Sequence, residues 1–147
     1  LQAPQIDKKS PQYEWLKTSL TTTSANKWKI IVTHNPIYSS GKSEDLLSSQ
    51  LAPLFELYKV NLVIQGHQGA YERTHPIKKG KISRNGPIYI TIGGSGKFFE
   101  ESSYENEWTN KYFATPHFAN IKIVDRKLSL RTYTYEAKLI DGLDINF

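Results

Sequence analysis

The sequence contains no cysteine and no methionine among its 147 residues. Without cysteine, the chain can form neither a disulfide nor a zinc site built on thiolates, although this does not indicate a compartment. No run of eighteen apolar residues occurs, so neither a membrane-spanning helix nor membrane insertion is expected. The opening LQAPQIDKKSPQ has the features of neither a signal peptide nor a presequence. Because it also lacks an initial methionine, we expect the chain to be a processed piece or a fragment of a longer protein.

The composition predicts a folded domain. Hydrophobic residues make up 38% of the chain and aromatic residues 12%, which is enough for a core, so we expect one domain over residues 1–147. The net charge of +5 favours anionic ligands such as phosphates, but the scattered lysines fit a solvated basic surface equally well. The one dense basic run, KKGKISR at 78–84, lacks interleaved aromatic residues, so no nucleic-acid partner is expected.

The first half of the chain has the pattern of a strand–helix–strand unit. Ser10-Pro11 can begin a short amphipathic helix, and WKIIVTH (28–34) predicts a strand buried on both faces. A second helix is expected over residues 44–58, with Pro53 as a point of kinking. Its apolar stripe consists of Leu46, Leu47, Leu51, Leu54, Phe55 and Tyr58. VNLVIQGH (60–67) predicts another buried strand, so the two strands should be parallel with a right-handed crossover.

The second half predicts one further strand, a long loop and an antiparallel C-terminal hairpin. GPIYITIGGSG (86–96) reads as a strand bounded by glycines, and 97–116 as a long loop of low regularity. FANIKIVD (118–125) and LSLRTYTYEA (128–137) alternate and favour a hairpin, and 139–147 can add a short edge strand. The expected fold class is therefore α/β: a βαβ unit followed by antiparallel C-terminal strands.

Two histidines lie at the carboxyl ends of the two predicted parallel strands. His34 and His67 should be neighbours at the edge where α/β sheets bind their ligands. Imidazole is a common ligand of zinc and iron, so the pair can hold a metal ion. Ordinary hydrogen-bonded loop histidines would also fit the pattern, and the residue types alone leave both interpretations open.

The order of the motifs resembles a known family. VTHNPIYSSG, an amphipathic helix, YKVNLVIQGHQGAYERTHPI and GPIYITIGGSG are similar to the C-terminal half of a purple-acid-phosphatase-like (calcineurin-like) metallophosphoesterase. The resemblance spans nearly the whole chain and implies an α/β sandwich that binds two metal ions and hydrolyses phosphate esters. It also implies that His34 and His67 are ligands of the divalent metal.

The chain departs from the family pattern at several points. Gly69 stands where the family has the second histidine of Gly-His-x-His, so one ligand of the other metal is missing. The loop SSGKSED has Lys42 and Ser43 where relatives often have a histidine, and Lys42 can contact phosphate or simply be a solvated side chain. The aspartate-rich motifs of the family's N-terminal half do not occur.

The remaining candidates have weaker support. His75 before Pro76 is expected in a turn, with a contact at the pocket mouth as the alternative. His117 is expected to be structural. Glu72 and Arg73 should pair with each other or brace the site loop, and GGSG (93–96) should form a tight turn beneath the site rather than a phosphate cradle.

These observations support two hypotheses. The first is an acid-phosphatase-like enzyme that is inactive as this stretch alone and needs the N-terminal half of the same protein. It would act on phosphate esters with one or two ions of iron, zinc or manganese. The second is a degenerate, inactive module of a larger cell-surface protein. A single metal used for binding or mononuclear hydrolysis is a further variant. The resemblance implies an extracellular or cell-surface location.

Overall fold

The computed structural model of the protein describes residues 6–41, 45–96 and 106–146. The first helix, α1, spans Pro11–Thr22 and begins as its sequence predicts. Ser10 caps it by accepting a hydrogen bond from the Tyr13 N–H over 3.2 Å, and Pro11 occupies the first helical position. The second helix, α2, spans Asp45–Leu57 and contains Pro53.

A five-stranded mixed sheet forms the centre of the molecule, in the order β1-β2-β6-β3-β7. Its strands are β1 (Ile30–Thr33), β2 (Leu62–Gln65), β6 (Ile88–Ile92), β3 (Tyr71–Thr74) and β7 (Thr109–Phe113). β1, β2 and β6 run parallel, and β3 runs antiparallel to both β6 and β7. Since α2 connects β1 to β2, the predicted βαβ unit is confirmed.

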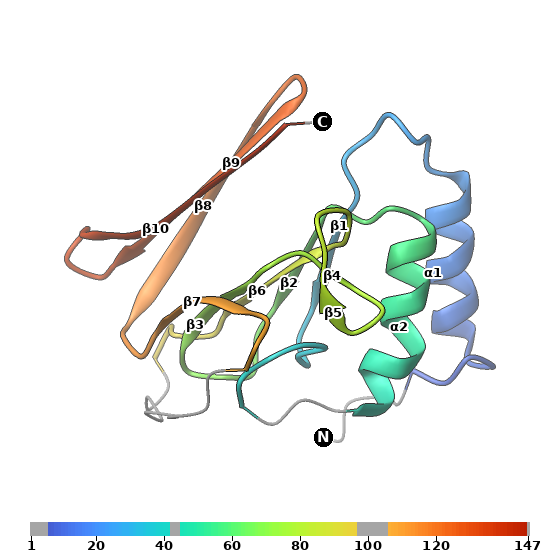
Figure 1. The fold of residues 1–147 in the computed structure, drawn as a ribbon, viewed down its shortest axis with the longest axis horizontal. Coiled ribbons are helices and arrows are strands. Elements are labelled where there is room, and N and C mark those ends of the chain that lie inside the picture. The colour runs from blue at the N-terminus through green and yellow to red at the C-terminus, as the bar shows by residue number, and fades with distance from the viewer. Residues whose placement is uncertain (1–5, 42–44, 97–105, 147) are drawn as a thin grey trace.

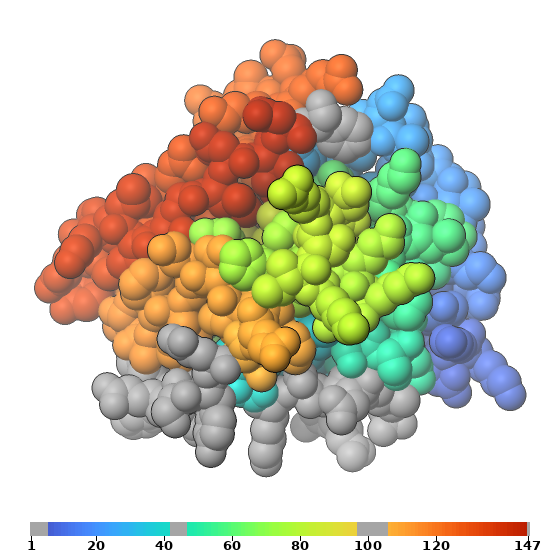
Figure 2. Space-filling view, in the orientation of Figure 1, coloured from blue at the N-terminus to red at the C-terminus, as the bar shows by residue number. Residues whose placement is uncertain are grey.

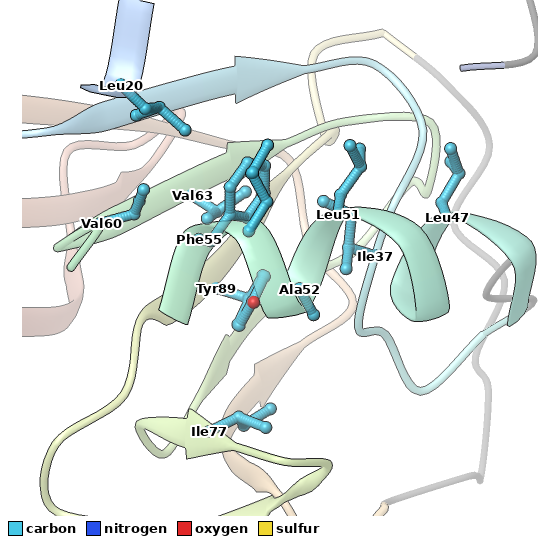
Figure 3. Packing of buried hydrophobic residues seen from close by; sticks show 11 residues of the cluster. Leu20, Ile37, Leu47, Leu51, Ala52, Phe55, Val60, Val63, Ile77 and Tyr89 are labelled. Atoms are coloured by element: carbon cyan, nitrogen blue, oxygen red, sulfur yellow. The ribbon is translucent and has the colours of Figure 1, made fainter. Parts of the chain in front are cut away.

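The two helices lie against one face of this sheet (Figure 1). Phe55 of α2 is fully buried and packs among aliphatic side chains from β2 and the preceding loop (Figure 3). The cluster consists of Leu20, Ile37, Leu47, Leu51, Ala52, Leu54, Phe55, Val60, Val63, Ile77 and Tyr89. None of the described helices is long and apolar enough to cross a membrane.

A three-stranded antiparallel sheet lies against the other face (Figure 1). Its strands are β8 (His117–Val124), β9 (Lys127–Thr134) and β10 (Leu139–Asn146), in the order β10-β9-β8. A second core, formed by Leu62, Tyr71, Ile90, Leu128 and Leu130, lies between the sheets, and all five side chains are fully buried. The molecule is thus layered as helices, mixed sheet and antiparallel sheet, which confirms the expected α/β class with antiparallel C-terminal strands.

A small hairpin carries the basic run. β4 (Ile77–Lys78) pairs with β5 (Lys81–Ile82), and Gly80 takes the left-handed backbone conformation at the turn, with φ +70°. Figure 2 shows this hairpin, in yellow-green, on the surface between α2 and the C-terminal strands. The lysines of the run are exposed.

Two sequence-based expectations about the strands were wrong, and one strand was missed. β1 is not buried on both faces: it pairs only with β2 among the described strands, and the Val32 side chain is 76% exposed. The segment 97–116 is not wholly loop, because it contains β7, which pairs with β3; residues 97–105 lie outside the described part. β3 itself was not predicted. Its sequence YERT is mostly polar and shows no apolar alternation; the segment is a strand because it pairs with β6 on one side and β7 on the other.

Candidate metal centre

His34 directly follows β1, and His67 comes two residues after the end of β2. Because the two strands are parallel neighbours, both histidines lie at the same edge of the sheet. The His34 Nε2 and His67 Nδ1 atoms lie 3.3 Å apart, and the ring planes are nearly perpendicular at 85°. Both side chains are exposed. The parallel register of the strands explains the contact, because it carries both chains to one edge, as the sequence predicted.

The backbone at His67 has an uncommon conformation. Its φ of +69° lies in the left-handed region, which non-glycine residues seldom adopt and which costs roughly 1–2 kcal/mol. Two hydrogen bonds support this turn: the Gly66 N–H donates to the His34 carbonyl over 3.1 Å, and the Gln68 N–H donates to the Gly66 carbonyl over 2.8 Å. The first of them also joins the two histidine-bearing segments. Strain held at such a position is typical of functional sites.

The separation of the two ring nitrogens is compatible with a shared metal ion. Two nitrogen ligands bound at about 2.0–2.1 Å stand about 2.9 Å apart at a right angle and about 3.4 Å apart at the tetrahedral angle. The observed 3.3 Å falls within this range. It also permits a direct N–H···N hydrogen bond, so the same geometry serves the pair when no metal is bound.

A buried glutamate of β3 binds the loop that follows β1. Glu72 of β3 is only 2% exposed, and its carboxylate accepts hydrogen bonds from the Ser39 hydroxyl, the Ser40 N–H and the Ser40 hydroxyl over 3.1, 2.6 and 2.7 Å. The Thr109 hydroxyl of β7 donates to it over 2.7 Å. Glu72 therefore fixes the loop that begins at His34.

A buried glutamine of β2, the strand next to β1, holds the same loop. Gln65, at the end of β2, is 2% exposed, and its side-chain oxygen accepts from the Ile37 N–H over 2.9 Å. Its amide nitrogen donates to the Tyr38 carbonyl and, over 3.0 Å, to the Thr91 hydroxyl. The sequence analysis missed this role of Gln65. A polar residue ending an otherwise apolar buried strand was the available signal, since such a group needs buried partners.

Glu72 and Arg73 do not pair with each other. Successive side chains of a strand point to opposite faces, so Glu72 faces the loop after β1 and Arg73 faces the second sheet. Of the two expectations, the bracing of the loop is therefore confirmed for Glu72, and the Glu72–Arg73 pair is wrong. There the Arg73 Nε and Nη2 atoms donate to the Asp141 carboxylate over 2.6 and 3.0 Å, and the Tyr71 hydroxyl donates to it over 2.6 Å. Burial raises the pKa of Asp141, but the hydrogen bonds from Arg73 and Tyr71 outweigh it, so the pKa is lowered overall.

The glycines of GGSG allow close packing beneath the histidine loop. A Cβ atom on Gly93 would overlap the carbonyl oxygen of Gln68, and a Cβ on Gly94 would overlap the ring of His117. Gly96 has a φ of +89°. The segment therefore packs against the backbone of the histidine loop, in agreement with the expected turn beneath the site.

His75 and His117 lie away from the pair. His75 follows β3, which runs antiparallel to β6, so it lies at the opposite edge of the sheet, where the amide nitrogen of Asn110 contacts its ring over 3.1 Å. This position does not suit a contact at the pocket mouth. His117 is 4% exposed and donates from Nδ1 to the Thr115 carbonyl over 2.7 Å, as a structural histidine would. Burial lowers its pKa.

The described residues provide only part of a metal site. Among residues 6–41, 45–96 and 106–146, no group of three or more His, Asp or Glu side chains is arranged to hold a metal ion. Gly69 is half-buried in the loop after His67 and offers no side-chain ligand. Lys42 and Ser43 lie outside the described residues.

Comparisons with known proteins point to one family. The sequence model of the calcineurin-like phosphoesterase family matches residues 2–71 of this chain. Purple acid phosphatase 21 of Arabidopsis thaliana is 32% identical over 131 residues, which cover 80% of this chain and 29% of that protein. Purple acid phosphatase 18 of the same plant is 36% identical over 96 residues, which cover 61% and 22% of the two chains. The chain therefore spans less than a third of the length of these relatives.

The solved structures include a close match to this fold. Purple acid phosphatase PPD1 from yellow lupin seeds superposes with a TM-score of 0.87 at 25% sequence identity. The alignment covers 95% of this chain and 28% of the lupin protein. Nearly all of the chain therefore has a counterpart within one part of that larger enzyme.

Proposed function

Because this chain belongs to the purple-acid-phosphatase-like metallophosphoesterases, we propose that it contributes His34 and His67 as metal ligands to a site that hydrolyses phosphate esters. The observation that carries this proposal is the 3.3 Å separation of the His34 Nε2 and His67 Nδ1 atoms at the carboxyl edge of the sheet. Residues 1–147 would then be the C-terminal part of a metallophosphoesterase catalytic domain.

The chain's own residues have defined tasks in this proposal. His34 and His67 would bind an iron, zinc or manganese ion through their ring nitrogens. That ion would act as a Lewis acid toward the phosphate ester. Glu72 and Gln65 would fix the loop after His34, and the left-handed turn would fix His67, so both rings are held before a metal arrives.

The proposal requires further ligands from the N-terminal half of the same protein. Two imidazoles are fewer than the roughly three protein ligands that a catalytic zinc site has, and Gly69 removes the ligand expected for a second ion. We therefore expect one ion to bind more firmly than the other and the chain alone to lack phosphatase activity. Lys42 stays a candidate for a contact with phosphate, with a solvated surface side chain as the alternative.

Metal binding by histidine variants tests the assignment. Calorimetric titration of the metal-free full-length protein with Zn²⁺ or Mn²⁺ should detect at least one bound ion, and His34→Ala or His67→Ala should remove it. His75→Ala is the matched control, because His75 lies at the opposite edge of the sheet and should leave binding unchanged. Binding that survives both substitutions at the pair would contradict the proposal.

The second candidate function is a phosphoesterase fold without catalysis that acts as a structural or binding module. Gly69 favours it, because a site that lacks one imidazole binds its ion more weakly. Metal content and phosphatase turnover of the full-length protein distinguish the two candidates. Two equivalents of metal together with turnover exclude the module, whereas a metal-free, inactive full-length protein supports it. An extracellular or cell-surface location is part of both, and detection of the secreted protein tests it.

A further inference from the structure

The β4–β5 hairpin concentrates positive charge that the surrounding fold does not neutralise. Lys78, Lys79 and Lys81 are exposed, and no ion pair joins them to a carboxylate in the part of the chain that the structure describes. The same holds for the exposed Arg84, just after the hairpin, and for Lys59, just after α2. Lys59 and Arg84 line a common hollow with Lys78. These five cations therefore share one surface around the hairpin (Figure 2).

Two features of the hairpin would favour residues other than lysine. Lys78 and Lys81 lie directly opposite each other in the pairing of β4 with β5, and like charges at opposite positions are destabilising. Lys79 has a φ of +54° and is followed by Gly80 with a φ of +70°. Such a pair of values belongs to a tight hairpin turn in which Asn, Asp or Gly is preferred at the first position. The hairpin therefore carries its lysines although they lower its stability, which is typical of a functional site.

Two aliphatic side chains are exposed beside these lysines. Leu57, at the end of α2, is 71% exposed and lines a hollow of about 650 Å³ with Lys78 and Lys79. Ile82 is 52% exposed on the hairpin itself. The Lys79 N–H donates to the Glu56 carboxylate over 2.7 Å and so joins the hairpin to α2. We call the resulting patch the hairpin surface; it consists of Leu57, Lys59, Lys78, Lys79, Lys81, Ile82 and Arg84.

We propose that the hairpin surface binds the anionic headgroups of a lipid membrane. Its cations would meet phosphate and carboxylate groups, while Leu57 and Ile82 would reach the boundary between headgroups and acyl chains. The site is separate from the histidine pair, because the hairpin follows β3, which ends at the sheet edge opposite His34 and His67. Membrane binding at the hairpin surface therefore leaves the histidine pair uncovered.

Two other occupants explain this surface less well. A second copy of the chain would bring the same cations against each other across a twofold axis, which is repulsive. A soluble polyanion would use the cations but leave the exposed Leu57 and Ile82 without a role. Nucleic-acid bases would also need aromatic side chains for stacking, and the run 78–84 has none. The combination of unpaired cations with exposed aliphatic side chains therefore favours a membrane.

Vesicle binding by the full-length protein in EDTA tests the proposal. The protein should sediment with phosphatidylcholine vesicles that contain about a third phosphatidylserine, and it should stay in solution with phosphatidylcholine alone. Lys78→Glu/Lys81→Glu should weaken binding about tenfold or more, because each basic residue near an anionic surface raises affinity about fivefold. Lys122→Glu/Lys138→Glu is the matched control. It changes the net charge equally at exposed positions of the C-terminal segment, so it should leave binding nearly unchanged.

Two further variants separate membrane contact from the stability of the hairpin. Lys79→Gly suits the φ of +54°, so the hairpin should stay folded, yet binding should weaken about fivefold because one cation is lost. Leu57→Ser should weaken binding several-fold, because it removes apolar area that enters the membrane. Circular dichroism of each variant verifies that it is folded.

Several outcomes would overturn the inference. Equal binding to neutral and anionic vesicles, or equal effects of the two double variants, would exclude a membrane site at the hairpin. Binding of heparin or inorganic polyphosphate without binding of vesicles would assign the surface to a soluble polyanion instead. Because EDTA keeps the histidine pair free of metal, vesicle binding does not depend on the phosphoesterase proposal. A full-length protein that binds vesicles but shows no turnover with metal would refute that proposal alone.

Discussion

The Glu72 carboxylate accepts hydrogen bonds from both the backbone N–H and the hydroxyl of Ser40, over 2.6 and 2.7 Å. These two residues are 32 positions apart, and their contact joins the strand after the His67 loop to the loop after His34. Thr109 of β7 adds a third segment to the same carboxylate. The Glu72 carboxylate thus holds the loop that begins at His34 without touching either histidine ring.

Replacement of this carboxylate should loosen the site and destabilise the fold. Glu72→Gln retains one acceptor oxygen but places an NH₂ group against hydroxyl and N–H donors, leaving buried donors unsatisfied. A loss of about 1–3 kcal/mol in the free energy of unfolding is expected, as for buried donors left without an acceptor. Urea denaturation measures it, and Glu107→Gln, at an exposed position, is the control. An equal effect of the two substitutions would show that the network does not hold the loop.

The Arg73–Asp141 pair should be important for the attachment of the antiparallel sheet. The two side chains are 11% and 3% exposed, so Asp141→Ala leaves a buried guanidinium and the Tyr71 hydroxyl without their shared acceptor. Breaking such a pair costs about 3–5 kcal/mol, whereas replacing both charges by apolar side chains is often nearly neutral. The double variant Arg73→Met/Asp141→Leu should therefore unfold at a higher urea concentration than Asp141→Ala. The opposite order would contradict this account.

The same pair sets an acid limit on stability. The pKa of Asp141 is lowered in the folded protein, so its contribution to stability is present above the unfolded value of about 3.9 and is lost as the pH falls below it. The difference in unfolding free energy between the wild type and Asp141→Asn should consequently shrink between pH 5 and pH 2. Denaturation curves across this range measure the change, and a constant difference would exclude the linkage.

The sequence predicts those parts of the fold in which local pattern and burial agree. The cap at Ser10, the apolar stripe of α2 and the apolar strand 62–65 all identified their elements, and the two strand ends identified His34 and His67 as neighbours. Each signal rests on residues that are close in the chain or on the general rule for parallel sheets.

What the sequence does not predict depends on distant partners. β3 is polar because Glu72 bonds to a loop more than thirty residues earlier and Arg73 to a carboxylate 68 residues later, so no local alternation marks it as a strand. β1 reads as a buried strand, but its exposure depends on whether another strand lies beside it. Neither the strand at β3 nor the exposure of β1 can be predicted from residues that are close in the sequence.

His117 should make the fold sensitive to mild acid. Burial lowers its pKa, although its hydrogen bond to the Thr115 carbonyl acts in the opposite direction, and Nε2 has no partner among the described residues. Protonation therefore costs more in the folded than in the unfolded protein, so stability is lost as the pH falls below the unfolded value of about 6.5. His117→Gln should flatten the fall in melting temperature between pH 7.5 and pH 5.5. His75→Gln should retain it, and an unchanged slope in His117→Gln would assign the effect elsewhere.

Gly69 offers the sharpest test of whether the site is weakened or lost. Gly69→His restores the imidazole that the family uses for its other metal ion, so the full-length protein should bind Zn²⁺ or Mn²⁺ at that second position about tenfold or more tightly, since even the outer partners of a metal contribute that much. Lys138→His adds a histidine at an exposed position after β9 and controls for nonspecific binding. In the full-length protein, Gly69→His should raise turnover of p-nitrophenyl phosphate. Unchanged metal affinity and turnover would mean that more than one ligand has been lost, which is the result that the module hypothesis requires.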